Sequence, residues 1–107
     1  MAGQSLNAFK VYNNNLPCSK QVINTQLSSP NEEIIKTLKK GDVLAIELIS
    51  SRHTLVALFE DEIAGVIVNK EMIKLIDCIK KGQSFEAVIR NIIGGMCAIT
   101  IKSINSL

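Results

Sequence analysis

His53 is the only histidine of the chain, and it follows the polar run Ser50-Ser51-Arg52. One histidine excludes a metal site built on two or more histidines of the same chain, and any nucleophile–histidine–acid set would have to use this residue. Polar residues between two apolar runs are typical of a solvated turn. The alternative is that Arg52 and His53 contact phosphate beside the serine hydroxyls.

Cys18, Cys78 and Cys97 lie far apart in the sequence and form no C-x-x-C pair. Their spacing signals neither a disulfide framework nor a zinc site, and a reducing compartment is the simpler interpretation. Cys78 and Cys97 lie among apolar residues and are expected to be small buried core side chains. Cys18 follows Pro17 in a predicted loop and is expected to be exposed, with no base nearby to activate it.

Two further clusters have the residue types of a ligand site without its spacing. Glu60, Asp61 and Glu62 lack the additional staggered oxygen ligands of a hard-cation loop, so they are expected to form a solvated hairpin tip. Gly94-Gly95 lacks the pattern of a phosphate-binding loop and is expected to form a turn. No catalytic residue, metal or cofactor is predicted, and the chain is not expected to be an enzyme.

Twelve Lys+Arg residues against ten Asp+Glu residues give a net charge of +2, which neither requires nor excludes a polyanion partner. The lysine pairs at 39–40 and 80–81 each close a predicted helix, where cations offset the helix dipole. If both helices ended on the same side of the fold, these lysines would form a basic rim together with Arg52 and Lys70. The candidate nucleic-acid contacts are Arg52, His53, Lys70, Lys80 and Lys81.

The N-terminal third predicts two strands and a helix. Alternation over residues 6–12 and the polar run 20–27 predict strands, the second at a sheet edge. Ser29 is expected to cap a helix with Pro30 at its first position, and this helix would continue through Ile34, Ile35 and Leu38 and stop at Gly41.

The remainder predicts five strands around a second helix. Residues 43–49, 54–59 and 62–68 form a three-stranded meander, and 85–93 and 96–103 form a hairpin. Asn69 is expected to cap the second helix, which carries Met72, Leu75, Ile76 and Ile79 at helical spacing and ends at Gly82. The run 43–49 is apolar on both faces, so something must cover its second face.

These elements predict a single α+β domain over residues 1–107. Its order is β-(β)-α-β-β-β-α-β-β, and the expected architecture is a small, mainly antiparallel, five- or six-stranded β-barrel with two short helices. The residues expected to be buried are Ile46, Leu48, Val56, Leu58, Ile67, Leu75, Ile76, Ile79, Ile89 and Ile99.

Several segments occur in the order of a known family. Gly41-Asp42 opens a strand, Leu55-Val56-Ala57-Leu58-Phe59 forms a central one, and Ile63-Ala64-Gly65-Val66-Ile67 is similar to an Ile-Gly-Tyr-Leu segment. A helix at 69–79, a stop at Lys81-Gly82 and the strand Phe85-Glu86-Ala87-Val88-Ile89 follow. Over residues 41–102 the chain thus resembles a HIRAN domain, which implies a small β-barrel with flanking helices. The family's Glu-Pro-x-Asn-Pro-x-Asp segment is replaced by Ile49 to His53, so none of its DNA contacts is carried over.

The resemblance implies a non-enzymatic accessory module associated with DNA or RNA. Among the aromatic residues only Tyr12 is expected to be available for base stacking. The high apolar content favours the alternative, a protein-interaction or self-assembly module with a protein partner or a second copy of the chain. No signal-peptide pattern or membrane-spanning run is present, so the chain is expected to be cytoplasmic and to have no membrane partner.

Overall fold

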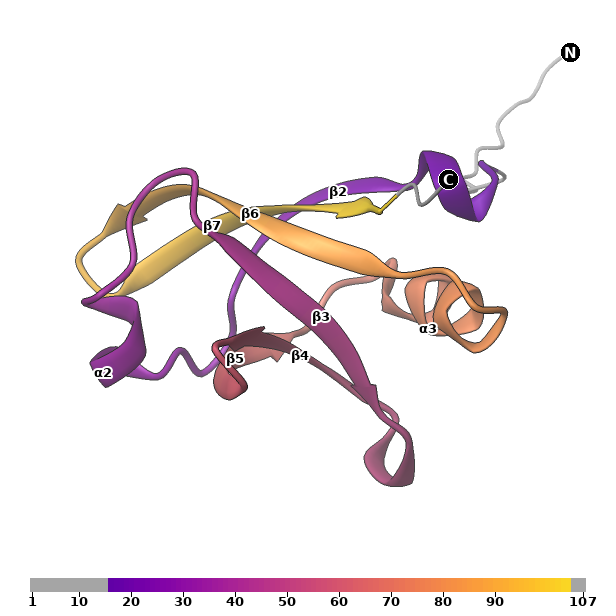
Figure 1. Ribbon diagram of the computed structural model, residues 1–107, viewed down its shortest axis with the longest axis horizontal. Helices are drawn as coiled ribbons and strands as arrows, with labels where there is room; N and C mark the ends of the chain where they lie inside the picture. The colour runs from indigo at the N-terminus through magenta and orange to yellow at the C-terminus, as the bar shows by residue number, and fades with distance from the viewer. Residues whose placement is uncertain (1–15, 105–107) are drawn as a thin grey trace, which may run out of the picture.

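A computed structural model describes residues 16–104 of the chain (Figure 1). In chain order the elements are η2 (Cys18–Lys20), β2 (Val22–Gln26), α2 (Glu32–Ile35), β3 (Val43–Ile49), η3 (Ser50–Arg52), β4 (Thr54–Phe59), β5 (Glu62–Ile67), α3 (Met72–Lys80), β6 (Phe85–Ile93) and β7 (Met96–Ser103), where η denotes a short 3-10 helix. This succession confirms the predicted order from the second strand onward. The strand predicted over residues 6–12 and the side chain of Tyr12 lie outside the described residues.

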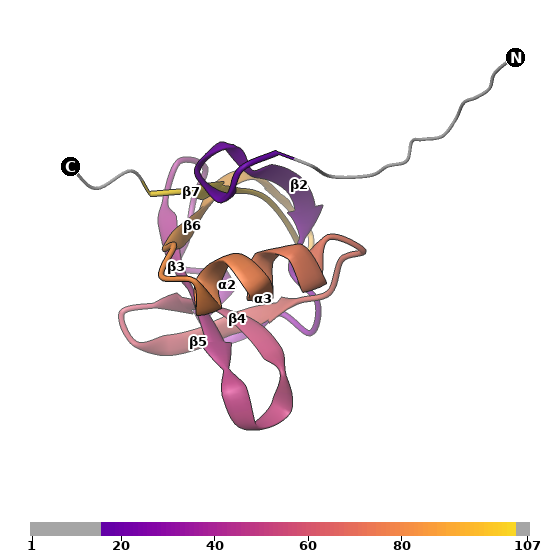
Figure 2. The same cartoon turned by 90° about the vertical axis from the view of Figure 1, so that its right-hand side faces the viewer.

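The strands form one six-stranded antiparallel sheet in the order β2-β7-β6-β3-β4-β5. The sheet curls into a half-barrel, and α3 lies across one of its ends (Figure 2). The two sides of the curl meet where Ser28 and Val66 exchange backbone hydrogen bonds of 2.8 and 2.9 Å. The predicted α+β class, a small antiparallel barrel-like sheet with two short helices, is confirmed, and β2 is an edge strand as expected.

The two tight hairpins have the backbone geometry that their sequences favour. Glu60 (φ 50°) and Asp61 (φ 69°) both adopt left-handed conformations between β4 and β5, as a type I′ turn requires. Gly94 adopts φ 59° between β6 and β7, which fits a type II′ turn. The predicted hairpin tip at Glu60 and Asp61 is thereby confirmed.

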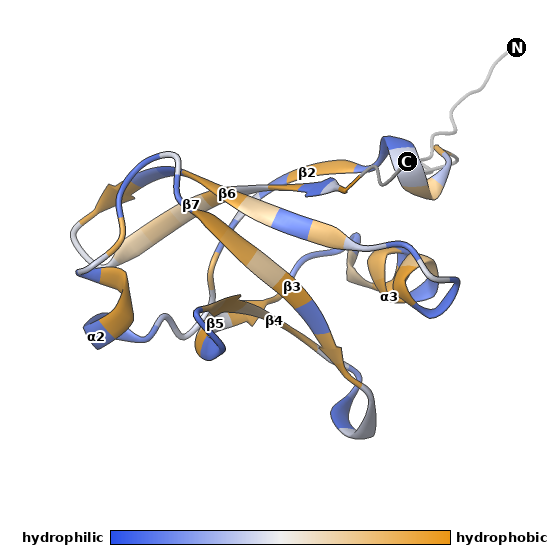
Figure 3. Cartoon of the chain, in the orientation of Figure 1, coloured by the Kyte–Doolittle hydropathy of each residue, from blue (hydrophilic) through white to orange (hydrophobic). Residues whose placement is uncertain are grey.

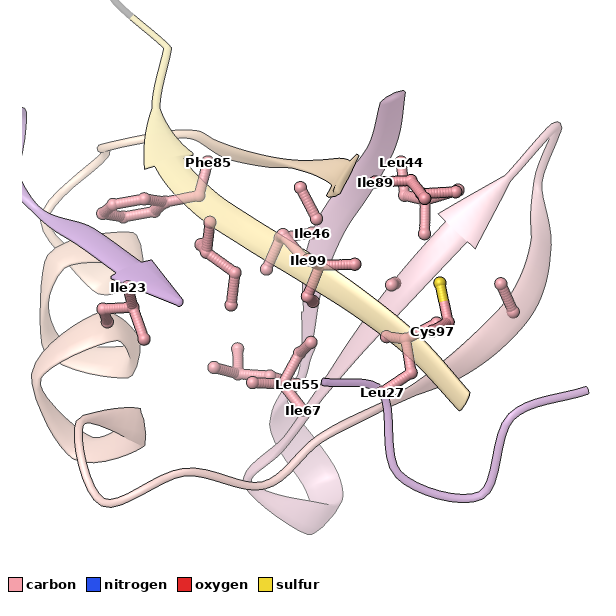
Figure 4. Packing of buried hydrophobic residues seen from close by; sticks show 14 of the residues in the cluster. Ile23, Leu27, Leu44, Ile46, Leu55, Ile67, Phe85, Ile89, Cys97 and Ile99 are labelled. Atoms are coloured by element: carbon pink, nitrogen blue, oxygen red, sulfur yellow. The ribbon is translucent and has the colours of Figure 1, made fainter. Parts of the chain in front are cut away.

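The core lies inside the curl, where aliphatic side chains from the strands point toward one another (Figure 4). Among the residues predicted to be buried, those that the structure buries are Ile46, Val56, Ile67, Leu75, Ile76, Ile89 and Ile99. Leu48, Leu58 and Ile79 are only partly buried. Leu48 and Ile79 line a hollow at the end of the barrel, and Leu58 follows a bulge in the pairing of β4 with β5.

α2 is shorter than predicted and begins later. Its N-cap is Asn31, whose side-chain oxygen accepts hydrogen bonds from the backbone N–H groups of Glu33 (3.0 Å) and Ile34 (3.4 Å). Ser29 adopts φ 48°, a left-handed conformation that an N-cap does not have, so the prediction of a Ser29 cap with Pro30 inside the helix was wrong. The chain must turn at Ser29 because its neighbour Ser28 is bonded to β5.

α3 matches its prediction closely. Leu75, Ile76 and Cys78 are buried, and Gly82 just beyond the helix adopts φ 101°. Asn69 accepts a hydrogen bond of 2.8 Å from the backbone N–H of Glu71, so it orders the turn that leads into the helix and does not cap the first helical turn. The helix therefore carries its apolar stripe onto the end of the half-barrel.

The outer face of β3 corrects a further expectation. Leu44 and Ile46 face the core, but Val43, Ala45 and Glu47 at the alternate positions are exposed. Figure 3 shows β3 as a mostly hydrophobic strand that is interrupted by a hydrophilic segment. The predicted cover over this face is therefore not present in the part of the chain that the structure describes. Ala45 is small and Glu47 is charged, so this face of β3 tolerates water better than the unbroken apolar run suggests.

Within residues 16–104, no helix has the length and apolar character needed to cross a membrane.

Candidate functional site

The loop between β3 and β4 carries Arg52 and His53, the two residues that the sequence suggests for catalysis or phosphate contact. η3 ends at Arg52 and is followed by His53, which adopts φ 51° and donates its backbone N–H to the carbonyl of Ser50 at 3.3 Å. Thr54 Oγ1 donates to the carbonyl of Arg52 at 3.1 Å. Arg52 and His53 are exposed, which confirms the predicted solvated turn.

His53 lies beside the outer surface of α3. Together they form a hollow of about 340 Å³, lined by His53, Met72, Ile73, Ile76, Asp77 and Lys80. Ile73 is 78% exposed and lines the hollow beside Met72 and Ile76. We call this area the α3 hollow. Half of its lining residues are apolar, and the other half are polar or charged.

The charges around the α3 hollow are unequal. Asp77 forms an ion pair of 3.1 Å with Lys81, and both side chains are more than half exposed. The pair therefore contributes at most about 1 kcal/mol to the stability of the fold. Lys80 has no ion-pair partner among the described residues. It also lines a second hollow of about 360 Å³, together with Ser50 and Gln83. Lys80 is therefore an available cation between two depressions.

The structure brings together only some of the predicted nucleic-acid contacts. His53 and Lys80 share the α3 hollow, and Arg52 precedes His53 in the exposed loop. Lys81 is engaged with Asp77. Lys70 lies beyond the opposite end of the nine-residue helix α3, which is about 13 Å long at a rise of ~1.5 Å per residue.

The basic rim that was expected if both helices ended on the same side of the fold does not form. α2 and α3 lie at opposite ends of the half-barrel, so the lysines at 39–40 are far from those at 80–81 (Figure 1). A hollow of about 400 Å³ near α2 is lined by Pro30, Glu32, Glu33, Ile35, Lys36, Ile92, Gly94 and Gly95. Its charged groups include the exposed ion pair of Glu33 and Lys36 at 3.0 Å, which leaves little field for a ligand.

The cysteines depart most from the prediction. Cys18 and Cys78 form a disulfide with their Cα atoms 5.5 Å apart, and the two residues are 60 positions apart in the sequence. The prediction that no disulfide is present was wrong, so the cysteine spacing no longer argues for a reducing compartment. The prediction of an exposed Cys18 was also wrong, because Cys18 is partly buried against the core. No sequence pattern near either cysteine predicts this pair, because only the packing of η2 beside α3 brings the two sulfurs together.

Cys97 behaves as predicted. It is buried in β7 and is a free thiol, and burial raises the pKa of that thiol above its ordinary value by disfavouring the thiolate. The described residues contain no group of three or more histidine, cysteine, aspartate or glutamate side chains placed to hold a metal ion.

Sequence reasoning also passed over Ile73. Its signal was present: it lies one position off the stripe of Met72, Leu75, Ile76 and Ile79, so a helical arrangement turns it away from the core. An isoleucine at such a position is the part of the α3 hollow with the most apolar surface to lose on contact.

Neither a family model nor a curated protein nor a solved structure matches this chain.

Proposed function

We propose that the chain is a non-enzymatic accessory module of the cytoplasm, as its resemblance to HIRAN domains implies, and that it binds a short segment of a protein partner in the α3 hollow. The observation that carries this proposal is the exposed Ile73, which shares a hollow with two other apolar side chains and with three polar or charged ones. Protein interfaces combine an apolar centre with a polar edge in the same way. Complete burial of one isoleucine side chain contributes about 1.5–3 kcal/mol.

The charges of the α3 hollow select the partner's chemistry. Lys80 offers an ammonium group without an ion-pair partner among the described residues, whereas the carboxylate of Asp77 is paired with Lys81. A partner segment with aliphatic side chains next to an aspartate or glutamate would contact the apolar side chains of the hollow and pair with Lys80. We therefore propose an acidic, aliphatic peptide as the ligand class.

Nucleic acid is the second candidate, because His53 and Lys80 line the same depression beside Arg52. Two observations weigh against it. The aromatic residues in the described part, Phe59 and Phe85, are half-buried and buried, so neither offers a free face for base stacking. The lysines at the two helix ends do not converge, and phosphate binding depends on clustered cations.

A selection from a random peptide library on the immobilised full chain tests the proposal. We expect enrichment of aliphatic peptides that contain aspartate or glutamate. In fluorescence anisotropy, Ile73→Gln should weaken binding of a selected peptide by about tenfold, which is ~1.4 kcal/mol. Lys80→Gln should weaken it less and flatten its dependence on salt. Ile93→Gln is the matched control, since Ile93 is also exposed (60%) but lies on β6 away from the α3 hollow.

Other outcomes identify other functions. Binding of single-stranded, duplex or 3′-tailed DNA at physiological salt that falls on replacement of Arg52 and Lys80 would favour the second candidate. A dimer in light scattering that Ile73→Gln dissociates would identify a second copy of the chain as the occupant. If the selected peptides bound wild type and Ile73→Gln with equal affinity, the α3 hollow would be refuted as the docking site.

A further inference from the structure

The disulfide joins two elements that are otherwise distant in sequence. η2 and α3 lie at the same end of the half-barrel (Figure 1), and Cys18 of η2 is bonded to Cys78 of α3. Cys78 is 0% exposed and belongs to the core, whereas Cys18 is half-buried at its margin. The two cysteines therefore differ in their exposure to solvent, and Cys18 is the more exposed of the two.

The bond is attached to the helix that lines the α3 hollow. Cys78 follows Asp77 directly and lies two residues before Lys80, and both of these residues line the hollow. η2 in turn is held to β7 by the Ser103 hydroxyl, which donates to the carbonyl of Ser19 at 2.7 Å. The disulfide thus connects α3 through η2 to the sheet, and its loss leaves α3 held by the packing of Leu75 and Ile76.

We propose that Cys18–Cys78 is a thiol–disulfide exchange site that fixes α3 when oxidised and loosens it when reduced, with a cellular thiol or dithiol as the reagent. The regulatory consequence, control of peptide binding in the α3 hollow, rests on the proposed function. In the cytoplasm that we propose for the chain, disulfides are usually transient and redox-sensing. The placement of this bond between a partly buried and a fully buried cysteine suits such a role.

The exchange has a defined direction. An incoming thiolate attacks Cys18 Sγ and forms a mixed disulfide, while the Cys18–Cys78 bond breaks and its electron pair leaves on Cys78 Sγ, which takes up a proton. The second thiolate of a dithiol reagent then attacks the reagent sulfur that is bonded to Cys18. This displaces the Cys18 thiolate, which also takes up a proton. The reagent ends as a disulfide, and both cysteines of the chain end as thiols. Cys97 takes no part, because it is buried as a thiol.

Thiol counting and hydrogen exchange test the switch without any ligand. The full chain purified without reductant and then denatured should take up alkylating reagent at Cys97 only, and after dithiothreitol at all three cysteines. Reduced glutathione added to the native protein should be found on Cys18 by peptide mass. Reduction should lower the exchange protection of α3 amides by about tenfold or more.

Two variants act as controls. Cys97→Ser should keep the full response to reductant. Cys18→Ser should show the low α3 protection in either condition; if it does not fold, the wild-type chain reduced and alkylated under native conditions replaces it. Three reactive thiols in the unreduced chain, glutathione on Cys78, or equal α3 protection in both redox states would each overturn the switch.

Anisotropy with a selected peptide separates this inference from the proposed function. The reduced chain should bind the peptide about tenfold more weakly, which is ~1.4 kcal/mol. Equal affinity in both redox states would overturn the regulatory link and leave the docking site standing. A redox-dependent α3 protection in a chain that binds no peptide would refute the docking site and support the switch.

Discussion

Asn31 shows how the turn after β2 depends on a single side chain. Its side-chain oxygen holds two N–H groups of α2 while its backbone N–H donates to Ala64 of β5 at 2.8 Å. Asn31→Ala removes the cap and keeps the backbone bond, so the free energy of unfolding should fall by about 1 kcal/mol. Ser29→Ala should change it little. Urea denaturation of both variants checks this, and an equal loss for Ser29→Ala would return the cap to Ser29.

At the scale of elements, α3 separates a core face from a surface face. Leu75 is 0% exposed, so Leu75→Ala should lower the free energy of unfolding by about 2–5 kcal/mol through lost burial and a cavity. Ile73→Ala on the opposite face should stay within about 0.5 kcal/mol of wild type. Chemical denaturation of the pair gives the difference directly. Similar midpoints for the two variants would show that α3 does not pack on the half-barrel.

At the scale of the whole molecule, the join between the two sides of the curl depends on a close approach at Gly65. A Cβ at this position would lie 2.9 Å from the Cβ of Leu27, which is buried in the segment that crosses from β2 to β5. Gly65→Ala should therefore destabilise the fold by about 1–3 kcal/mol through overpacking. Gly95→Ala is the control, because a Cβ there meets open space, and it should be neutral or slightly stabilising. Thermal unfolding of both variants compares them, and an unchanged midpoint for Gly65→Ala would contradict the tight join.

The sequence by itself determined the local parts of this protein. The spacing of Leu75 and Ile76 predicted α3, and the short linkers at Glu60 and Gly94 predicted the hairpins, because helical periodicity and turn chemistry act over a few residues. The antiparallel barrel-like class followed from these elements. His53 as a solvated turn residue and Cys97 as a buried thiol followed in the same way from their immediate neighbours.

Only the tertiary structure decided what depends on distant segments. The Cys18–Cys78 bond, the join at Ser28 and the left-handed Ser29 that moves the helix cap to Asn31 all arise where chain ends and loops are brought against other elements. The same holds for the site: Lys80 and His53 line one hollow, but Lys70 and the lysines at 39–40 lie elsewhere, because the half-barrel separates the helices. Periodicity gives the face of each element, whereas the relative placement of elements follows from how their faces pack together.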